Sequence, residues 1–268
     1  MKKKTILILL LLLFLSVFIF SGVSMLIELS QRERDDETFD ELADLIEILD
    51  VSISDNSVAE HSKALDDTSE EGLSGEVSSP DATAYHKRNL APIIEKNNDC
   101  IGWIYIKDTQ VNYPVMYTPY EPQKYIDKSF DLKSSSYGVP FLEYLCTPYG
   151  DHVVIYGHNM KNGSMFATLK LYRNAEYFSS HPVIEFETVE GCKTYRVLAM
   201  CEISSSDKWY SFLDTSNEAE FKRQTERILK RAVNKADFTP EFGKQIITLS
   251  TCQGSNKDAR LVLIAIEG

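Results

Sequence analysis

Residues 5–27 contain no charged side chain and consist mostly of Leu, Ile, Phe and Val. This stretch constrains the fold strongly, because about 20 apolar residues are enough to cross a bilayer as a helix. Three lysines precede it and acidic residues follow it. By the positive-inside rule, this charge pattern predicts a cytoplasmic tip at residues 1–4 and a C-terminal body outside the cell.

A cleaved signal peptide is the alternative interpretation of the same stretch. Its apolar core is longer than the roughly 7 to 15 residues usual in signal peptides, and residues 21–24 offer only a weak cleavage site. We therefore expect residues 5–27 to form an uncleaved transmembrane anchor in a single-pass cell-membrane protein.

Residues 28–85 differ from the rest of the chain in charge. They carry 18 Asp and Glu against 3 Lys and Arg, so residues 86–268 have no net formal charge although the whole chain has −12. Residues 39–49 show helical apolar spacing and predict an amphipathic helix, whereas the composition of residues 51–83 predicts disorder. We expect a solvated acidic stalk or linker, in preference to a specific role such as keeping the domain off an anionic wall.

The remaining 183 residues, 86–268, are enough for one sizeable core, and we expect them to fold and act alone. Short apolar runs with strand character recur along them, which is typical of a mainly β fold. We predict eight strands, at residues 101–106, 111–115, 139–142, 152–156, 183–187, 195–203, 246–251 and 260–267.

Two helices are predicted in the same region. Residues 84–97 form a leading helix that Pro92 breaks or kinks. Residues 216–233 have the strongest helical pattern of the chain, with one apolar stripe and basic residues on the other faces. This second helix falls between the sixth and seventh predicted strands.

The last two predicted strands flank a pair of side chains suited to anionic chemistry. Cys252 ends one apolar run, and Arg260 opens the next after a polar loop that contains one Gly. Such a loop is typical of a connection between adjacent strands, so the thiol and the guanidinium can share one site. The thiolate is the attacking form of Cys, a nearby cation favours it, and a fixed Arg can stabilise an oxyanion.

His158 is the best candidate for a proton-transfer partner among the five histidines. It follows an apolar run and Gly157, which permits a sharp exit from the strand and leaves the imidazole at a strand end, where sites are common. From spacing alone, a small core Cys, a turn His and a surface Arg are the favoured explanation. We expect the other four histidines to be structural or solvated: His61, His86, His152 and His181.

The motifs around these three residues resemble the sortase signature. Residues 248–252, Thr-Leu-Ser-Thr-Cys, together with Arg260 and the Tyr-Gly-His-Asn of residues 156–159, are similar to class B sortases. Residues 99–104 and 111–116 resemble the first strands of the family, and residues 166–171 resemble the helix that follows the histidine. The resemblance covers residues 86–268 and implies a closed or nearly closed eight-stranded β-barrel with appended helices, including one between strands 6 and 7.

The resemblance also implies a function, that of a membrane-anchored cysteine transpeptidase on the outer face of a Gram-positive-type cell. Cys252 would attack the Thr carbonyl of a C-terminal sorting signal on a secreted protein, His158 would transfer protons, and Arg260 would hold the oxyanion or the substrate backbone. An amine of a peptidoglycan precursor would resolve the thioacyl intermediate. A pilin polymerase that uses a Lys amine of another subunit is the second alternative, and an inactive anchored peptide-binding module is the third.

Three further residues are weaker candidates for substrate binding. Asn159 could position the imidazole or contact substrate, although a turn-forming Asn is equally favoured. Ser250 and Thr251 flank the thiol, but β-propensity alone explains the Thr. A group of tyrosines could wall a peptide groove, with an incidental cluster equally favoured: Tyr113, Tyr117, Tyr120, Tyr125 and Tyr137.

The sequence contains no Cys/His cluster with metal-ligand spacing and no Gly-rich phosphate loop after a strand. We expect no cofactor, since the implied chemistry requires none, and no nucleic-acid partner. The five cysteines are an odd number, so at least one thiol is free. If Cys252 is the nucleophile, four remain, and buried, unpaired thiols are favoured over disulfides: Cys100, Cys146, Cys192 and Cys201.

Overall fold

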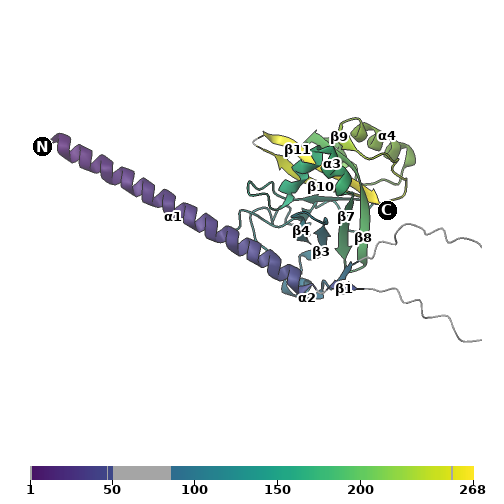
Figure 1. Cartoon of the computed structure of the whole chain (residues 1–268), viewed down its shortest axis with the longest axis horizontal. Helices are drawn as coiled ribbons and strands as arrows, with labels where there is room; N and C mark the ends of the chain where they lie inside the picture. Colours follow the sequence, from purple (N-terminus) through teal and green to yellow (C-terminus); the bar gives the residue numbers. More distant parts are fainter. Residues whose placement is uncertain (1, 47, 51–85, 255) are drawn as a thin grey trace, which may run out of the picture.

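A computed structural model describes residues 2–46, 48–50, 86–254 and 256–268. Eight strands close into a mixed β-barrel in the order β11-β10-β6-β5-β4-β3-β7-β8, because β8 also pairs with β11. The fold prediction is therefore confirmed (Figure 1). The barrel strands are β3 (Cys100–Tyr105), β4 (Asn112–Met116), β5 (Phe141–Leu142), β6 (His152–Tyr156), β7 (Val183–Thr188), β8 (Gly191–Ser204), β10 (Ile246–Gln253) and β11 (Asn256–Glu267).

Strand β11 has apolar side chains on both faces because it lies between two cores. Leu261, Leu263 and Ala265 belong to the main core. The alternate residues, Val262, Ile264 and Ile266, belong to a second core that also contains Trp209, Phe212, Phe221 and Ile228. Because successive side chains point to opposite faces of a strand, β11 is buried on both sides.

Helix α4 (Glu218–Leu229) covers the second core and lies between β8 and β10, as predicted. It begins at Asn217, whose side chain accepts a hydrogen bond from the backbone N–H of Glu220. It ends earlier than the predicted residue 233, because Ala232–Lys235 form β9, a ninth strand that pairs with β8. The sequence pattern did not predict this strand.

The predicted helix at residues 84–97 is wrong at its start. His86–Arg88 form strand β2, and helix α2 is limited to Ala91–Lys96. Pro92 lies in the first turn of α2, where a missing N–H costs no intrahelical hydrogen bond, so it begins the helix instead of kinking it. The helix expected after the histidine is wound more tightly than an α-helix: η1 (Phe166–Arg173) is a 3₁₀-helix, and α3 (Ala175–Ser180) follows it.

Helix α1 (Lys2–Leu45) is one continuous helix that includes the apolar stretch and the first part of the acidic stalk. The prediction of a separate amphipathic helix at residues 39–49 is therefore wrong, because residues 39–45 are the end of α1. The helix ends against the barrel (Figure 1), where Phe39, Leu42 and Ile46 join the main core. The Phe39 ring meets the Tyr113 ring edge-on, with centroids 5.0 Å apart.

Two acidic side chains of α1 bind the long connection between β4 and β5. The Ser135 hydroxyl donates to the Asp35 carboxylate at 2.6 Å, and the Tyr137 hydroxyl donates to Asp36 at 3.4 Å. Burial raises the pKa of the Asp35 carboxyl, and the hydrogen bond from Ser135 opposes that shift. The stalk thus contributes buried contacts to the barrel.

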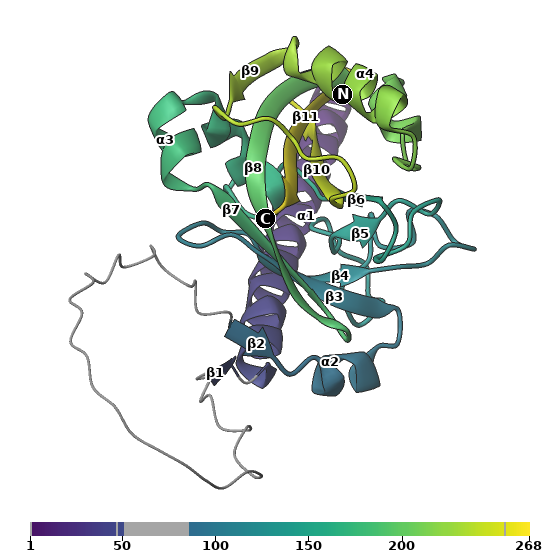
Figure 2. The same cartoon turned by 90° about the vertical axis from the view of Figure 1, so that its right-hand side faces the viewer.

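Strand β1 (Ile48–Asp50) pairs with β2 and forms a small second sheet. This pair and α2 lie at one end of the barrel, and α4 with β9 lies at the opposite end (Figure 1 and Figure 2). Residues 51–83, for which the sequence predicts disorder, lie outside the described residues.

All five cysteines lie in the described part of the chain, and all five are free thiols. Cys100, Cys146 and Cys201 are buried, as expected, whereas Cys192 is only half-buried. Burial raises the pKa of each of these four thiols to about 12. Only Cys252 is exposed.

Candidate active site

The pairing of β6 with β10 brings His158 beside Cys252. The two strands are parallel and in register from Ile246 opposite His152 to Ser250 opposite Tyr156. Cys252 and His158 each lie two residues further along, so both side chains leave the sheet at the same end and on the same face. The backbone N–H of Gly157 donates to Ser250 at 3.1 Å and extends this pairing toward the site.

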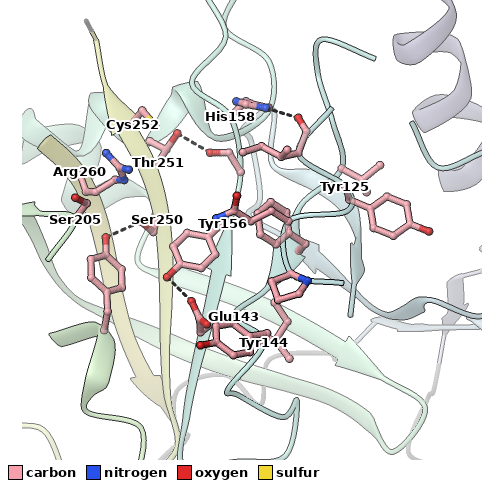
Figure 3. A pocket seen from close by; sticks show the side chains of 18 residues that line it. Tyr125, Glu143, Tyr144, Tyr156, His158, Ser205, Ser250, Thr251, Cys252 and Arg260 are labelled. Carbon is pink, nitrogen blue, oxygen red and sulfur yellow. Dashed lines mark hydrogen bonds between the residues drawn. The ribbon is translucent and has the colours of Figure 1, made fainter. Parts of the chain in front are cut away.

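Arg260 reaches the same site from β11. In the antiparallel pair of β10 and β11, Cys252 lies directly opposite Arg260. Side chains that face each other in this way have Cβ atoms about 5 Å apart on one face of the sheet. The structure therefore brings together the three residues that the sequence singled out (Figure 3).

Gly157 is required by close packing at the end of β6. A Cβ atom added to it would lie 2.7 Å from the ring of Phe166, the first residue of η1. Phe166 is fixed there because its backbone N–H donates to the carbonyl of His158 at 2.9 Å. A larger residue at position 157 would displace the backbone that carries the imidazole.

The imidazole of His158 is held by a backbone carbonyl that sequence reasoning did not identify. Its Nε2 lies 2.6 Å from the carbonyl oxygen of Ile126, in the connection between β4 and β5. Since a carbonyl only accepts hydrogen bonds, Nε2 carries the proton of this contact. Figure 3 shows this edge of the ring turned toward the connection, so that Nδ1 is not used in this contact.

Two of the three weaker candidates for substrate binding form hydrogen bonds between the ends of β6 and β10. Asn159 donates through Nδ2 to the carbonyl of Cys252 at 2.8 Å, and Thr251 donates through Oγ1 to the carbonyl of Gly157 at 2.7 Å. Ser250 is buried, and its hydroxyl is 2.8 Å from that of Tyr210. Ser250 and Thr251 line the cavity described next, whereas Asn159 is not among its lining residues.

A cavity of about 350 Å³ opens beside Cys252, His158 and Arg260. These three lie at one end, Glu143 and Tyr144 lie at the other, and Tyr156 stands between (Figure 3). Its tyrosine walls differ from the predicted ones, because only Tyr125 of the expected group lines it. The other wall tyrosines are Tyr144, Tyr156 and Tyr210, which come from separate segments and share no sequence pattern.

A buried hydrogen-bond chain supports β10, the strand that carries Cys252. Trp209 donates through Nε1 to the Thr248 hydroxyl at 3.0 Å, and that hydroxyl is 2.8 Å from Nε2 of His152. His152 Nδ1 lies 2.6 Å from the carbonyl of Phe212, so Nδ1 carries the proton and Nε2 accepts from Thr248. Burial lowers the pKa of His152 to about 4, which keeps the ring neutral and structural, as expected from the sequence.

The same chain fixes η2 (Lys208–Ser211), which presents Tyr210 to the cavity. Burial raises the pKa of Tyr210 to about 12, while the nearby Arg260 guanidinium opposes the shift. The cavity therefore combines an exposed thiol, an imidazole whose Nδ1 is not used in the contact with Ile126, a guanidinium and four tyrosine rings. In the part of the chain that the structure describes, no group of three or more His, Cys, Asp or Glu side chains could hold a metal ion.

This set of groups suits acyl transfer through a thioester, since it offers a nucleophile, an acid-base group and an oxyanion partner. Comparisons with known proteins agree with that chemistry. The family model described as the sortase domain matches residues 104–267. Sortase B of Listeria monocytogenes is 27% identical over 258 residues, which cover 95% of this chain and 92% of that relative.

Two solved structures share the fold. Sortase B from Bacillus anthracis in complex with AAEK1 has a TM-score of 0.68 at 22% identity, over 89% of this chain and 98% of that chain. A Staphylococcus aureus sortase B–substrate complex has a TM-score of 0.62 at 23% identity, over 67% of this chain and 84% of that chain.

Proposed function

This chain belongs to the sortase family of cysteine transpeptidases, with class B relatives, and from that premise we propose that it anchors secreted proteins to the cell wall. It cleaves a C-terminal sorting signal after a Thr residue and transfers the new carboxyl end to an amine of a cell-wall precursor. The observation that carries this proposal is the meeting of Cys252, His158 and Arg260 at one end of a peptide-sized cavity.

In the first half-reaction, the Cys252 thiol gives its proton to Nδ1 of His158, and the resulting thiolate attacks the carbonyl carbon of the Thr residue. The carbon–sulfur bond forms, and the carbonyl π electrons move to oxygen as an oxyanion. When this tetrahedral intermediate collapses, the peptide C–N bond breaks, and His158 gives its proton to the departing amine. The products are a thioacyl enzyme and the cleaved C-terminal fragment.

In the second half-reaction, the incoming amine attacks the thioester carbonyl and loses a proton to His158. The C–S bond breaks, which regenerates the Cys252 thiolate and leaves a new amide bond. Because Nε2 of His158 is held by the Ile126 carbonyl, Nδ1 is the nitrogen that exchanges the proton in both halves. Arg260 lies opposite Cys252 and stabilises the oxyanion each time.

Helix α1 supports a proposal for the cellular location. Lys4–Leu45 is a helix with a mean hydropathy of 3.0 in its most apolar window, long and apolar enough to cross a membrane. We propose that residues 5–27 are a single-pass anchor and that the barrel works on the outer face of the membrane, where both substrates would be found. The lysines at positions 2–4 support this orientation.

A pilin polymerase is a second candidate that differs only in the accepting amine. The test is transfer by the full chain in detergent micelles. Fluorescent sorting-signal peptides are offered together with either a short peptidoglycan-type amine or a Lys-containing peptide. Formation of the peptidoglycan-type conjugate supports wall anchoring, and exclusive use of the Lys amine supports the polymerase. Failure to cleave any peptide of the panel contradicts both.

A further inference from the structure

Met165 has a backbone conformation that is unusual for a residue with a side chain. Its φ is 56° and its ψ is −132°, at the position directly before η1. Among the described residues, four besides glycine have a positive φ, and only Met165 is buried. Glycine adopts such angles readily, whereas a Cβ atom makes them strained. A strained residue persists only where its surroundings hold it, and such residues are common at functional sites.

A tyrosine of the barrel wall binds this strained residue. The Tyr113 hydroxyl accepts a hydrogen bond from the backbone N–H of Met165 at 2.9 Å. Tyr113 belongs to β4, and its buried ring meets the ring of Phe39 edge-on. Burial raises the pKa of Tyr113 to about 12, so the hydroxyl is neutral at physiological pH. The contact thus joins a barrel strand to the residue that precedes η1.

The contacts that fix the backbone of His158 lie next to Met165. Phe166, the following residue, donates from its backbone N–H to the His158 carbonyl at 2.9 Å, and its ring packs closely against Gly157. Met165 itself forms a β-bridge with Asn159. The residues on both sides of His158 therefore meet Met165 or Phe166. A shift of Met165 would move the backbone from which the imidazole projects.

The orientation of the His158 ring depends on that backbone position. Its Nε2 lies 2.6 Å from the Ile126 carbonyl oxygen, which belongs to a different segment. A hydrogen bond weakens once its heavy atoms separate beyond about 3.2 Å, so the two segments must keep a fixed distance. In the proposed mechanism, this bond leaves Nδ1 to exchange the proton.

We propose that Tyr113 is a positioning residue for His158: its hydroxyl holds Met165 in the strained conformation that aligns the imidazole between Ile126 and Cys252. This inference rests on the proposed function, which assigns proton transfer to His158. Tyr113 does not line the cavity of the active site. It acts only through the backbone around Met165.

A hydroxyl that serves stability alone is the competing explanation, because a buried N–H without a partner is costly. Loss of such a hydroxyl would lower the melting temperature and leave the His158 ring unchanged in the folded protein. Loss of a positioning hydroxyl also changes the orientation of the ring and the reaction rate, at temperatures where the variant is fully folded. One variant therefore separates the two explanations.

The variant Tyr113→Phe removes only the hydroxyl, and its kinetics are measured with the full chain in detergent micelles. We expect kcat for a cleaved sorting-signal peptide to fall by about 10- to 100-fold with little change in KM, because a misplaced proton-transfer group slows the chemical steps and not binding. The matched control is Tyr172→Phe. It removes the hydroxyl of another buried tyrosine, which donates to the His181 carbonyl at 3.0 Å, and it should keep the wild-type kcat.

Nitrogen-15 NMR of labelled histidines reports the orientation of the ring directly. Well above the usual pKa of an imidazole, about 6.5, His158 should carry its proton on Nε2, as the contact with Ile126 requires. Tyr113→Phe should convert it to a mixture of the two tautomers. His152, whose proton is on Nδ1, should keep its signals. The His158 signals are identified by their absence from His158→Gln.

Unchanged kcat, or unchanged His158 signals, in a Tyr113→Phe variant shown to be folded by its melting curve would overturn the assignment. Equal losses of kcat in Tyr113→Phe and Tyr172→Phe would do the same, because they would reflect stability. A wild-type His158 without the Nε2–H tautomer also contradicts the inference, and this measurement needs no variant. If the wild type cleaves no peptide, the proposed function fails, and the NMR comparison alone decides whether Tyr113 orients the ring.

Discussion

The identity of the nucleophile rests on a contrast between five cysteines. Four are buried or half-buried, and burial raises their pKa values to about 12, so they are protonated at physiological pH. Cys252 is exposed, opposite Arg260 and beside His158. Position therefore favours Cys252 as the nucleophile that we propose, and it separates this thiol from the four less exposed ones.

Arg260 offers the sharpest residue-level prediction. If Arg260 stabilises the oxyanion, it does so as a planar, permanently charged group with several donors in fixed directions, and Lys reproduces this arrangement poorly. Arg260→Lys should stay folded and lose about 10²- to 10³-fold in kcat with little change in KM, because an interaction made mainly in the transition state is lost. Steady-state kinetics on a cleaved peptide measure this.

The matched control is Arg223→Lys on the exposed face of α4, where Arg223 pairs with Glu220. It should keep the wild-type rate. An Arg260→Lys variant with near-wild-type kcat, or with a raised KM alone, would show that Arg260 binds substrate or supports structure, and the oxyanion would then depend on backbone donors.

At the scale of elements, strand β10 depends on the neutral His152 beneath it. The folded chain holds the pKa of His152 at about 4, whereas an unfolded chain has about 6.5. Between these values the unfolded state binds a proton at His152 and the folded state does not. The contribution of neutral His152 to the free energy of unfolding is therefore complete above about pH 6.5 and is lost as the pH falls toward 4. The loss is on the order of 3 kcal/mol.

Urea unfolding between pH 7.5 and 4 measures this effect. The His152→Gln variant should lose the part of the pH-dependent slope that His152 causes, so subtracting its curve from that of the wild type should leave a loss of about 3 kcal/mol between pH 6.5 and 4. His181→Gln is the control, since His181 is only partly buried. An unchanged slope in His152→Gln would contradict the assignment.

The second element that matters is the last part of α1. Asp35 binds Ser135 in the same β4–β5 connection whose Ile126 carbonyl holds His158, and Phe39 lies in the main core. A chain that starts at residue 86 loses these contacts. The packing of α1 changes the expectation that residues 86–268 act alone: this shorter chain should be less stable and slower than one that starts at residue 28.

A single substitution tests the packing of α1 against the barrel. Phe39→Ala should lower the free energy of unfolding by about 3 kcal/mol, since it removes a buried aromatic ring. Leu29→Ala, at an exposed position of the same helix, should have little effect in the chain without residues 1–27. Equal unfolding midpoints for the chains that start at residues 28 and 86 would show that α1 is only a tether.

For the whole molecule, the sequence predicted the features that depend on local pattern. The barrel strands follow from short apolar runs, and the meeting of Cys252, His158 and Arg260 follows from strand ends and from the motif that surrounds them. The strand β9 and the start of α2 were missed, because tertiary pairing overrides weak local propensity there. The Ile126 carbonyl carries no sequence signal, since its hydrogen bond to His158 joins distant parts of the chain and exists only in the folded protein.

The central claim is that the cell-wall transfer passes through a thioester on Cys252. The most direct test incubates the full chain with a panel of sorting-signal peptides without an acceptor amine and records the intact mass. We expect one adduct with the mass of the peptide portion that ends in Thr, located on Cys252, released by hydroxylamine and absent from Cys252→Ala. Cleavage of the peptide by the Cys252→Ala variant, or an adduct on another residue, would contradict the account.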